Sequence, residues 1–214
     1  MNLRPFDDQL VRAVTDEGEV FTGFAEFLSA GYAADAYGPE EEALRIGDTL
    51  LFAGSLRSVG PLGLRRVFRR FEELTPAELY AILKARVDVF VVEQRCPYAE
   101  LDGLDQSAVH VWLEDGEGLR AYLRVLPRGA ESEYAAIGRV LTLKRGRGLG
   151  RLLLREGIGA AEDFFGAEEI YLEAQTQARG FYEKEGFRAM SEEVFPIDGI
   201  PHVRMLRRSA DAGE

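Results

Sequence analysis

The spacing of apolar residues first predicts a set of short strands near the start of the chain. Leu10–Thr15 and Val20–Phe27 are rich in Val, Phe and Thr, and the turn signal Asp16-Glu-Gly-Glu between them indicates a hairpin. A second hairpin is predicted for residues 43–46 and 49–52, and residues 56–59 add a last strand. Five short strands suit a small β-barrel, because closure removes exposed strand edges.

Further along the chain, the spacing of the apolar residues changes from the two-residue repeat of a strand to the repeat of about 3.6 residues of a helix. Val67–Phe71 reads as a strand. Thr75, Pro76 and Glu78 then stand at the N-cap, first and third positions of a helix start. One face of the helix that follows carries Leu79, Ile82, Leu83, Arg86 and Phe90.

The rest of the chain alternates between the two periods. An antiparallel hairpin is predicted from residues 109–113 and 119–126, followed by a strand at 134–143 and a helix that runs to about Phe165. The remaining elements are a strand at 169–174, a short helix at 178–185, and strands at 188–194 and 203–207 joined by 195–201. This order predicts a mixed α/β (α+β) fold.

These patterns divide the chain of 214 residues into two domains. We expect a small β-barrel at residues 1–60, a linker at 61–66, a second domain at 67–208 and a frayed tail at 209–214. Hydrophobic residues make up 46% of the chain, which is enough for a real core.

The composition of the chain narrows the kinds of molecule that it is expected to bind. The formal net charge is -11, which argues against a dedicated nucleic-acid binder. No apolar run has membrane-spanning length and the first residues do not resemble a secretion signal, so we expect no membrane contact. The single Cys96 fits a cytoplasmic protein. Residues 1–60 hold eleven acidic and four basic residues, so we do not expect this part to bind RNA. We expect it to contact the second domain or a second subunit, and a homodimer is one such arrangement.

The strongest chemical signal is a Gly/Arg turn between the strand ending near Leu143 and the next helix. Gly146, Gly148 and Gly150 leave the backbone open to a ligand, and a helix N-terminus attracts anions. The same stretch carries Lys144, Arg145, Arg147 and Arg151, which favours a bound phosphate. The Walker pattern is excluded because Gly150 is not followed by Lys and Ser/Thr, and the dinucleotide pattern fails on its position in the chain.

The segment Arg145–Gly150 resembles the pyrophosphate loop of the GNAT acetyltransferases, and Phe181–Phe187 resembles their second signature. More narrowly, Phe90–Tyr98, Ala174-Gln175 and 198–202 look like the ElaA-type branch, so the resemblance covers about residues 68–208. The N-terminal strands resemble an Sm-like or SH3-like barrel through the 16–18 turn, Gly23 and 46–49.

The resemblance implies the GNAT acyl-CoA N-acyltransferase fold, with a central mixed sheet, and acetyl-CoA as cosubstrate without a metal. It implies that backbone groups of Val140, Leu141 and Thr142 meet the pantetheine arm. Gln175 stands where the family often has Asn, and it would donate to a ligand carbonyl. The pyrophosphate would be held by Arg145, Gly146, Arg147, Gly148, Leu149, Gly150 and Arg151.

The implied reaction is direct attack of an amine on the acetyl group, which needs a base and an acid. Tyr182 is the expected general acid. For the base we rank Glu93 first, ahead of Glu100, Asp102 and Glu173, although a glutamate that only orders its loop fits Glu93 equally well. His202 and Gln94 are expected to contact the substrate, and His202 is also a candidate base. Cys96 is expected to be a buried small side chain, and His110 to be structural.

Three functions remain open at this point. We favour an amine N-acetyltransferase whose acceptor is a small polyamine, an amino acid or a protein. The alternative is a non-catalytic acyl-CoA sensor that uses the N-terminal barrel to bind a partner. An RNA-binding regulator is disfavoured by the acidic charge of residues 1–60.

Overall fold

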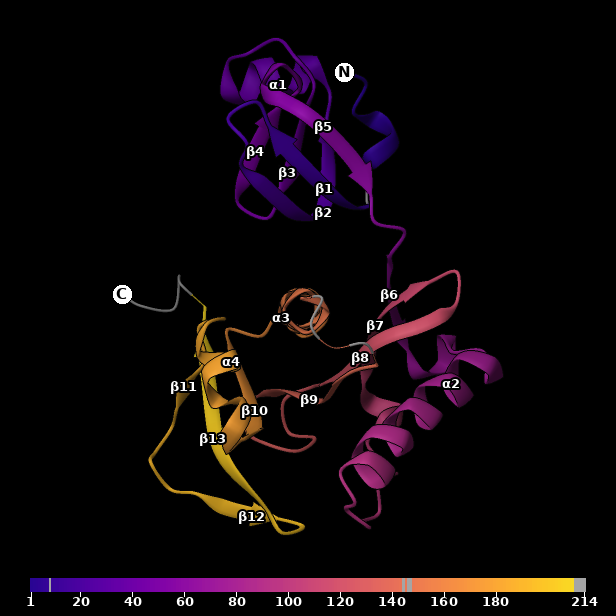
Figure 1. The fold of residues 1–214 in the computed structure, drawn as a ribbon. Helices are drawn as coiled ribbons and strands as arrows, with labels where there is room; N and C mark the ends of the chain where they lie inside the picture. The colour runs from indigo at the N-terminus through magenta and orange to yellow at the C-terminus, as the bar shows by residue number, and fades with distance from the viewer. Residues whose placement is uncertain (8, 144, 146–147, 210–214) are drawn as a thin grey trace. The chain divides into compact units, whose positions relative to one another are not determined.

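The computed structural model describes residues 1–7, 9–143, 145 and 148–209, which fall into two compact units, Met1–Arg65 and Arg66–Glu214 (Figure 1). Of the tail predicted at 209–214, only Ser209 lies among the described residues. The predicted linker at 61–66 begins inside the last strand of the first unit, and residue 65 opens the first strand that follows. Within the described ranges, no helix combines the length and the apolar content needed to cross a bilayer.

The first unit is built on one antiparallel sheet with the strand order β4-β3-β2-β1-β5. Its middle strand changes partner along its length, because residues 20–24 pair with β1 and residues 25–28 pair with β3. The sheet therefore bends around a core that includes Leu3, Val11 and Leu44. Its strands are β1 (Leu10–Thr15), β2 (Val20–Leu28), β3 (Ala43–Ile46), β4 (Thr49–Phe52) and β5 (Leu56–Pro61).

The predicted closed barrel is wrong, because this sheet remains open. Among the described strand pairings, β5 pairs with β1 and β4 pairs with β3, which leaves β4 and β5 as the two edges. Hairpin signals identify strands that are neighbours in sequence, whereas closure depends on hydrogen bonds between strands that are not. The structure also adds a helix, α1 (Ala30–Tyr37), whose N-cap Ser29 accepts a hydrogen bond from the Tyr32 N–H.

The second unit contains a mixed sheet with the strand order β11-β13-β10-β9-β8-β7-β6, and β12 pairs with β13 beside it. Strands β7, β8 and β9 are successive antiparallel neighbours, whereas β9 and β10 are parallel. The strands are β6 (Arg65–Arg70), β7 (Val109–Asp115), β8 (Gly118–Leu126), β9 (Ala135–Thr142), β10 (Glu169–Gln175), β11 (Arg188–Ala189), β12 (Phe195–Ile197) and β13 (Ile200–Arg208).

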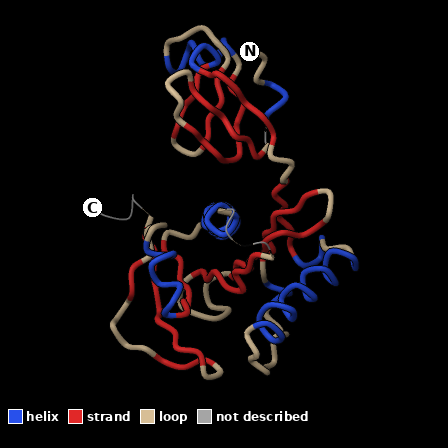
Figure 2. The backbone as a smooth tube through the Cα atoms, viewed as in Figure 1, coloured by secondary structure: helices blue, strands red, loops and turns tan. Residues whose placement is uncertain are grey.

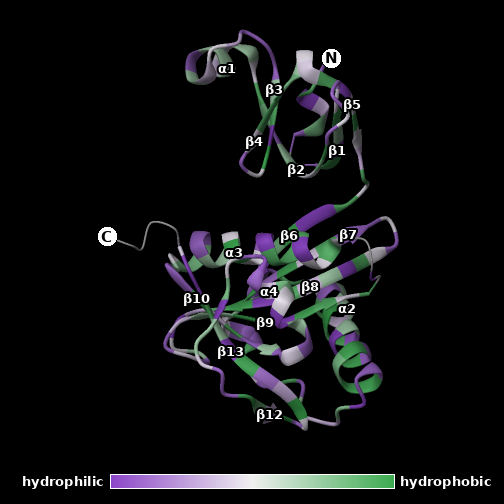
Figure 3. Ribbon diagram, turned by 60° about the vertical axis from the view of Figure 1, so that its left-hand side comes forward, coloured by the Kyte–Doolittle hydropathy of each residue, from purple (hydrophilic) through white to green (hydrophobic). Residues whose placement is uncertain are grey.

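Helices cover both faces of this sheet (Figure 2). On one face, α2 (Pro76–Arg86) packs against Trp112 and Tyr122, and its polar and apolar residues alternate in Figure 3. On the other face, α3 (Leu149–Phe165) contacts β7, β8 and β9. The contact is close at Gly157, where an added Cβ would lie 2.5 Å from a methyl carbon of Leu123. A π-helical segment (Val87–Glu93) extends α2, and α4 (Arg179–Glu183) follows β10.

Local signals in the sequence account for some of these boundaries. The predicted helix start is confirmed, since Thr75 Oγ accepts from the Glu78 N–H and the Glu78 carboxylate accepts from the Thr75 N–H. The region predicted as a strand at 188–194 forms only β11, and the expected connection at 195–201 contains β12. This strand pairs with β13 across Asp198 and Gly199, which both have positive φ as a tight hairpin turn requires.

Candidate active site

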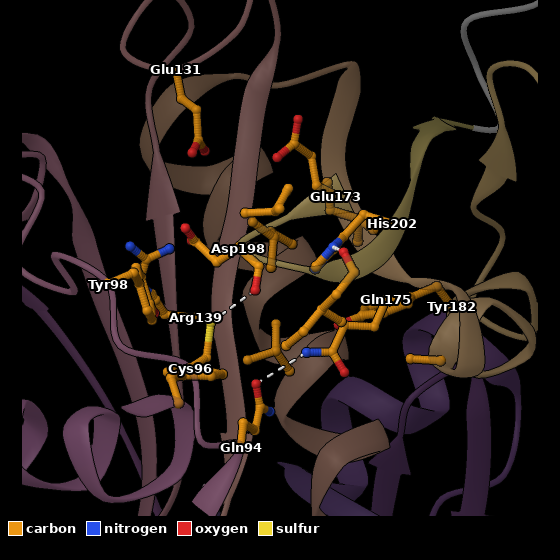
Figure 4. Close-up of a pocket in the computed structure, with 18 residues that line it drawn as sticks. Gln94, Cys96, Tyr98, Glu131, Arg139, Glu173, Gln175, Tyr182, Asp198 and His202 are labelled. Carbon is orange, nitrogen blue, oxygen red and sulfur yellow. Dashed lines mark hydrogen bonds between the residues drawn. The ribbon is translucent and has the colours of Figure 1, made fainter. Parts of the chain in front are cut away.

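Strands β9 and β10 are hydrogen-bonded only near their first residues. Their register pairs Ala135 with Ile170 and Ala136 with Tyr171, and no later pair is formed among the described residues. Past this point the strands separate around a cleft of about 240 Å³ (Figure 4). Its walls come from β9, β10, α4, the π-helical segment with the loop after it, the loop between β8 and β9, and the β12–β13 hairpin.

A bulge in β9 lies at the edge of this cleft. The register shift between Tyr122 and Arg124 of β8 sets Leu123 opposite two residues, Arg139 and Val140. Arg139 has φ 56°, in the left-handed region that side-chain-bearing residues seldom adopt. Bulges of this kind bend a strand and re-aim its backbone. The part of β9 that has separated from β10 therefore offers N–H and C=O groups to a ligand.

Two carboxylates, the buried Glu100 and the more exposed Asp102, hold Arg139 in this conformation. Its Nε donates to Glu100 Oε1 at 2.9 Å, and its Nη2 donates to Asp102 Oδ2 at 3.0 Å. Its guanidinium also lies 5.7 Å from the centre of the Tyr98 ring. A left-handed residue costs on the order of 1–3 kcal/mol, and hydrogen bonds to charged groups contribute roughly that much each. The two carboxylates thus offset the backbone strain of the bulge.

The same carboxylates belong to a larger charge cluster, in which Arg86, Asp105 and Arg124 are buried. Arg86 donates to Glu100 Oε2 at 2.6 Å and to Asp105 Oδ1 at 2.7 Å, and Arg124 donates to Asp102 and Asp105. Burial would raise the pKa of Asp102, but the hydrogen bond from Arg124 holds it below its ordinary value. Glu100 and Asp102 were candidate bases. Both are instead bound to arginines, so neither carboxylate is free to take a proton from a substrate.

The N-terminus of α3 lies where the phosphate site was predicted. Gly148 is its N-cap with φ 73°, and Leu149 is its first helical residue. At Gly150 an added Cβ would sit 3.6 Å from the Phe181 ring, so the helix start packs closely against α4. The first amides of a helix lack partners within it and attract anions. Of the other predicted phosphate contacts, Gly146 and Arg147 lie outside the described residues.

Two arginines at this helix start pair with acids from other elements. Arg145 is paired with Glu93, and both side chains are more than half exposed. Arg151 is paired with Glu185, which is also bound by Arg155. Glu93 is not among the residues that line the cleft, and its carboxylate contacts Arg145 of the predicted phosphate loop. Its position therefore favours the loop-ordering alternative over the role of base.

Two predicted glutamines bridge the cleft. Gln175 Nε2 donates to Gln94 Oε1 at 3.2 Å, joining β10 to the segment that follows Val87–Glu93 (Figure 4). Gln177 in turn donates to Gln175 Oε1 at 2.9 Å. In the β10–β13 register, Gln175 is paired with His202. Strand pairing therefore brings two residues that are far apart in sequence to the same wall.

His202 lines the cleft with one ring nitrogen fixed. Its side chain is buried, with 9% of the residue exposed, and Nδ1 lies 2.8 Å from the Ile200 carbonyl oxygen. Because a carbonyl only accepts, Nδ1 carries the proton in the neutral ring and Nε2 keeps its lone pair. No hydrogen bond to Nε2 is formed within the described residues.

Tyr182 lies on the α4 side of the same cleft. Its ring packs edge-on against Phe181 at 5.0 Å and against Phe187 at 6.0 Å, which fixes its direction. Burial raises the pKa of Tyr182 to about 12, so its hydroxyl stays protonated at neutral pH. No described group hydrogen-bonds that hydroxyl, which leaves it available to a ligand.

Comparison with known proteins agrees with this geometry. Residues 84–208 match the family described as an acetyltransferase (GNAT) domain, which is more than half of the chain.

The chain belongs to the GNAT acetyltransferase family.

Among its relatives is the protein ElaA of Escherichia coli strain K12, which is 36% identical over 144 residues, 65% of this chain and 94% of ElaA. A crystal structure of Escherichia coli ElaA covers 68% of this chain and 99% of its own, with a TM-score of 0.63 and 34% identity. An acyl-CoA N-acyltransferase from Pseudomonas aeruginosa is 40% identical, covers 66% of this chain and 98% of its own, and has a TM-score of 0.62.

The described residues fit the acetyl-CoA that the GNAT fold uses. The backbone of β9 that has separated from β10 can bond an amide-bearing arm, and the α3 N-terminus with Arg145 and Arg151 suits a pyrophosphate. Among the predicted β9 contacts, Val140 lines the cleft, whereas Leu141 packs in the core with α2. Thr142 lies beside Gly150, with its methyl carbon 3.6 Å from where a Cβ would stand.

Sequence reasoning missed part of the GNAT cleft. Glu131, in the loop between β8 and β9, lines it, and partial burial there raises the pKa of this carboxyl group. Asp198, at the β12–β13 turn, lines it as well, and its backbone oxygen accepts from Cys96 Sγ at 3.5 Å. No motif marks Glu131, so only its place in the fold identifies it. Asp198 carried a signal, because Asp-Gly between two apolar segments predicts a tight turn.

Proposed function

We propose that this GNAT acetyltransferase moves the acetyl group of acetyl-CoA directly onto an amine, with His202 as general base and Tyr182 as general acid. The observation that carries the proposal is the shared cleft. Both residues line it, and neither His202 Nε2 nor the Tyr182 hydroxyl has a hydrogen-bond partner among the described residues. Glu93 is replaced as the proposed base because its carboxylate contacts Arg145 outside the cleft.

The acceptor nitrogen must give up a proton as it attacks the acetyl carbon. In the neutral ring, Nδ1 keeps its proton on the Ile200 carbonyl, so Nε2 is the atom that accepts. The strand register places Gln175 beside His202, and Gln94 bonds Gln175. We propose that these amides orient the reacting groups at the base.

When acetyl-CoA is bound, it supplies the activated thioester. The N–C bond forms, the C–S bond breaks and sulfur leaves with the electron pair. Tyr182 donates its hydroxyl proton to that sulfur, while His202 holds the proton taken from the amine. Exchange with solvent then restores both groups, so no covalent enzyme intermediate and no role for Cys96 are needed.

Release of free CoA thiol from acetyl-CoA, measured across a panel of amines, tests this function. We expect turnover with at least one amine, and His202→Asn to lower kcat by about 10²–10⁴-fold. Asn keeps a donor for the Ile200 carbonyl and removes only the proton acceptor. A folded chain that binds acetyl-CoA but acetylates no amine would instead be the non-catalytic acyl-CoA sensor. An unchanged kcat in His202→Asn would remove His202 from the chemistry.

For the first unit we propose a protein contact and no nucleic-acid binding, which its excess of acids over bases supports. A homodimer is one form of that contact. Sedimentation of the full chain measures its mass, and nucleic acid that co-purifies with the chain would contradict the proposal.

A further inference from the structure

One end of the cleft carries more negative charge than the proposed reaction uses. Glu131, Glu173 and Asp198 all line it, and Figure 4 draws Glu131 and Glu173 at the end away from Gln94. Arg139 is the one Arg or Lys side chain among the described residues that line the cleft, and it is already bound by Glu100 and Asp102.

These three carboxylates have little charge compensation of their own. No ion pair is formed by the Glu131 or Asp198 side chain within the described part of the chain. Glu173 accepts from the Tyr171 hydroxyl at 2.7 Å, and Arg204 reaches it only at 3.9 Å. Partial burial raises the pKa of Glu131, and the charge of Glu173 raises it further against the opposing effect of Arg124 and Arg139. A bound ammonium would lower this pKa. This end of the cleft therefore favours a cationic ligand group.

That cation differs from the nitrogen that reacts. A nucleophilic amine must be neutral when it attacks. The buried His202 lines the same cleft and its Nε2 has no partner among the described residues, so this ring can take the proton of the reacting amine. A carboxylate cluster would hold the reacting nitrogen as an ammonium and oppose the reaction. The cluster is useful to a second ammonium on the same acceptor.

We infer that the acceptor is a small diamine or polyamine, with one neutral amine at His202 and a second, protonated amine bound by Glu131 with Glu173 and Asp198. The inference rests on the proposed function and names its substrate class. Amino acids are disfavoured, because their carboxylate would enter a cleft that is already anionic.

The test compares acceptor molecules that share one amino end and an alkyl chain but differ in the group at the other end of that alkyl chain. These are 1,4-diaminobutane, butylamine and 4-aminobutanoate, together with the matching set of eight-carbon compounds. Thiol release gives kcat/KM for each. We expect the diamine to exceed the monoamine by at least about tenfold at one chain length, and the amino acid to be the poorest. Added salt should raise KM for the diamine more than for the monoamine.

Two variants from one loop locate the effect. Glu131→Gln should bring the diamine-to-monoamine ratio of kcat/KM close to one, whereas Glu133→Gln, whose exposed side chain does not line the cleft, should keep it. Two results would overturn the inference and leave the proposed function standing. One is an equal kcat/KM for the diamine and the monoamine. The other is turnover of other amines in the panel with no turnover of either of these two. A ratio that Glu131→Gln does not change also overturns it. Failure of every amine overturns the proposed function itself.

Discussion

Replacement of Glu100 by Gln tests how the buried charge cluster supports the cleft. Glu100 is 3% exposed and accepts from Arg86 Nε, Arg86 Nη2 and Arg139 Nε at 2.9, 2.6 and 2.9 Å. Gln keeps the shape and one acceptor oxygen but leaves Arg86, which is fully buried, with less opposing charge. Removing one partner of a buried pair costs roughly 3–5 kcal/mol. We expect the lower end, about 3 kcal/mol, because one oxygen remains.

At this chain length, a loss of 1 kcal/mol lowers Tm by roughly 2–4 °C, so Glu100→Gln should lower Tm by about 6–12 °C. The single Trp112 lies in the core of the second unit, so its fluorescence reports the unfolding of that unit. KM for acetyl-CoA should also rise, because Arg139, which forms the β9 bulge, then faces a neutral amide in place of a carboxylate.

A matched control is Glu162→Gln, which breaks the more exposed pair with Arg207. Exposed pairs contribute about 0–1 kcal/mol, so this variant should change Tm by only a few degrees. If Glu100→Gln lowers Tm no more than Glu162→Gln does, the cluster does not stabilise the cleft and this reasoning is refuted.

Other predictions concern the cofactor, the acid and pH. Tyr182→Phe removes only the hydroxyl, so kcat should fall by about 10²–10⁴-fold with CoA affinity nearly unchanged, and a kcat within about twofold of wild type would leave Tyr182 as packing. Gly148→Glu introduces a negative charge and a side chain at φ 73°, and it should abolish CoA binding in calorimetry; unchanged affinity in a folded variant would move the site elsewhere. Burial lowers the pKa of His110 in the folded state. As pH drops below about 6.5, His110 therefore becomes protonated in the unfolded state before it does so in the folded state, and the free energy of unfolding of the second unit should fall. Asp102 and Asp105, whose pKa values the arginines lower, should add a further loss below about pH 4. Urea unfolding followed by Trp112 fluorescence measures both effects, and a flat profile between about pH 7 and pH 5 would contradict the first.

Local structure was readable from the sequence where neighbouring residues decide it. Thr75 and Glu78 cap a helix through their own backbone, and the predicted turn at 16–19 joins β1 to β2 with Gly18 at positive φ. Gly148 likewise begins α3 in the predicted turn. The two signature segments led to the right family for the same reason, since each is a short continuous stretch.

Long-range pairing was not readable in this way. The sequence predicted five strands in the first unit, but whether β4 meets β5 depends on the bend of β2, and the sheet stays open. Glu100 and Asp102 looked like candidate bases because a sequence does not state which acid meets which arginine. Arg139 lies 39 residues from Glu100, and only the fold brings them together.

The sequence by itself therefore determined the starts of α2 and α3, the first hairpin turns and the family. The tertiary structure decided which polar groups remain available in the cleft. His202 reaches it through its register with Gln175, Glu131 through a loop without a motif, and Glu93 is turned toward Arg145. The physical reason is that caps and turns are satisfied within a few residues, whereas the partner of a charge is fixed by strand register and burial across the whole sheet.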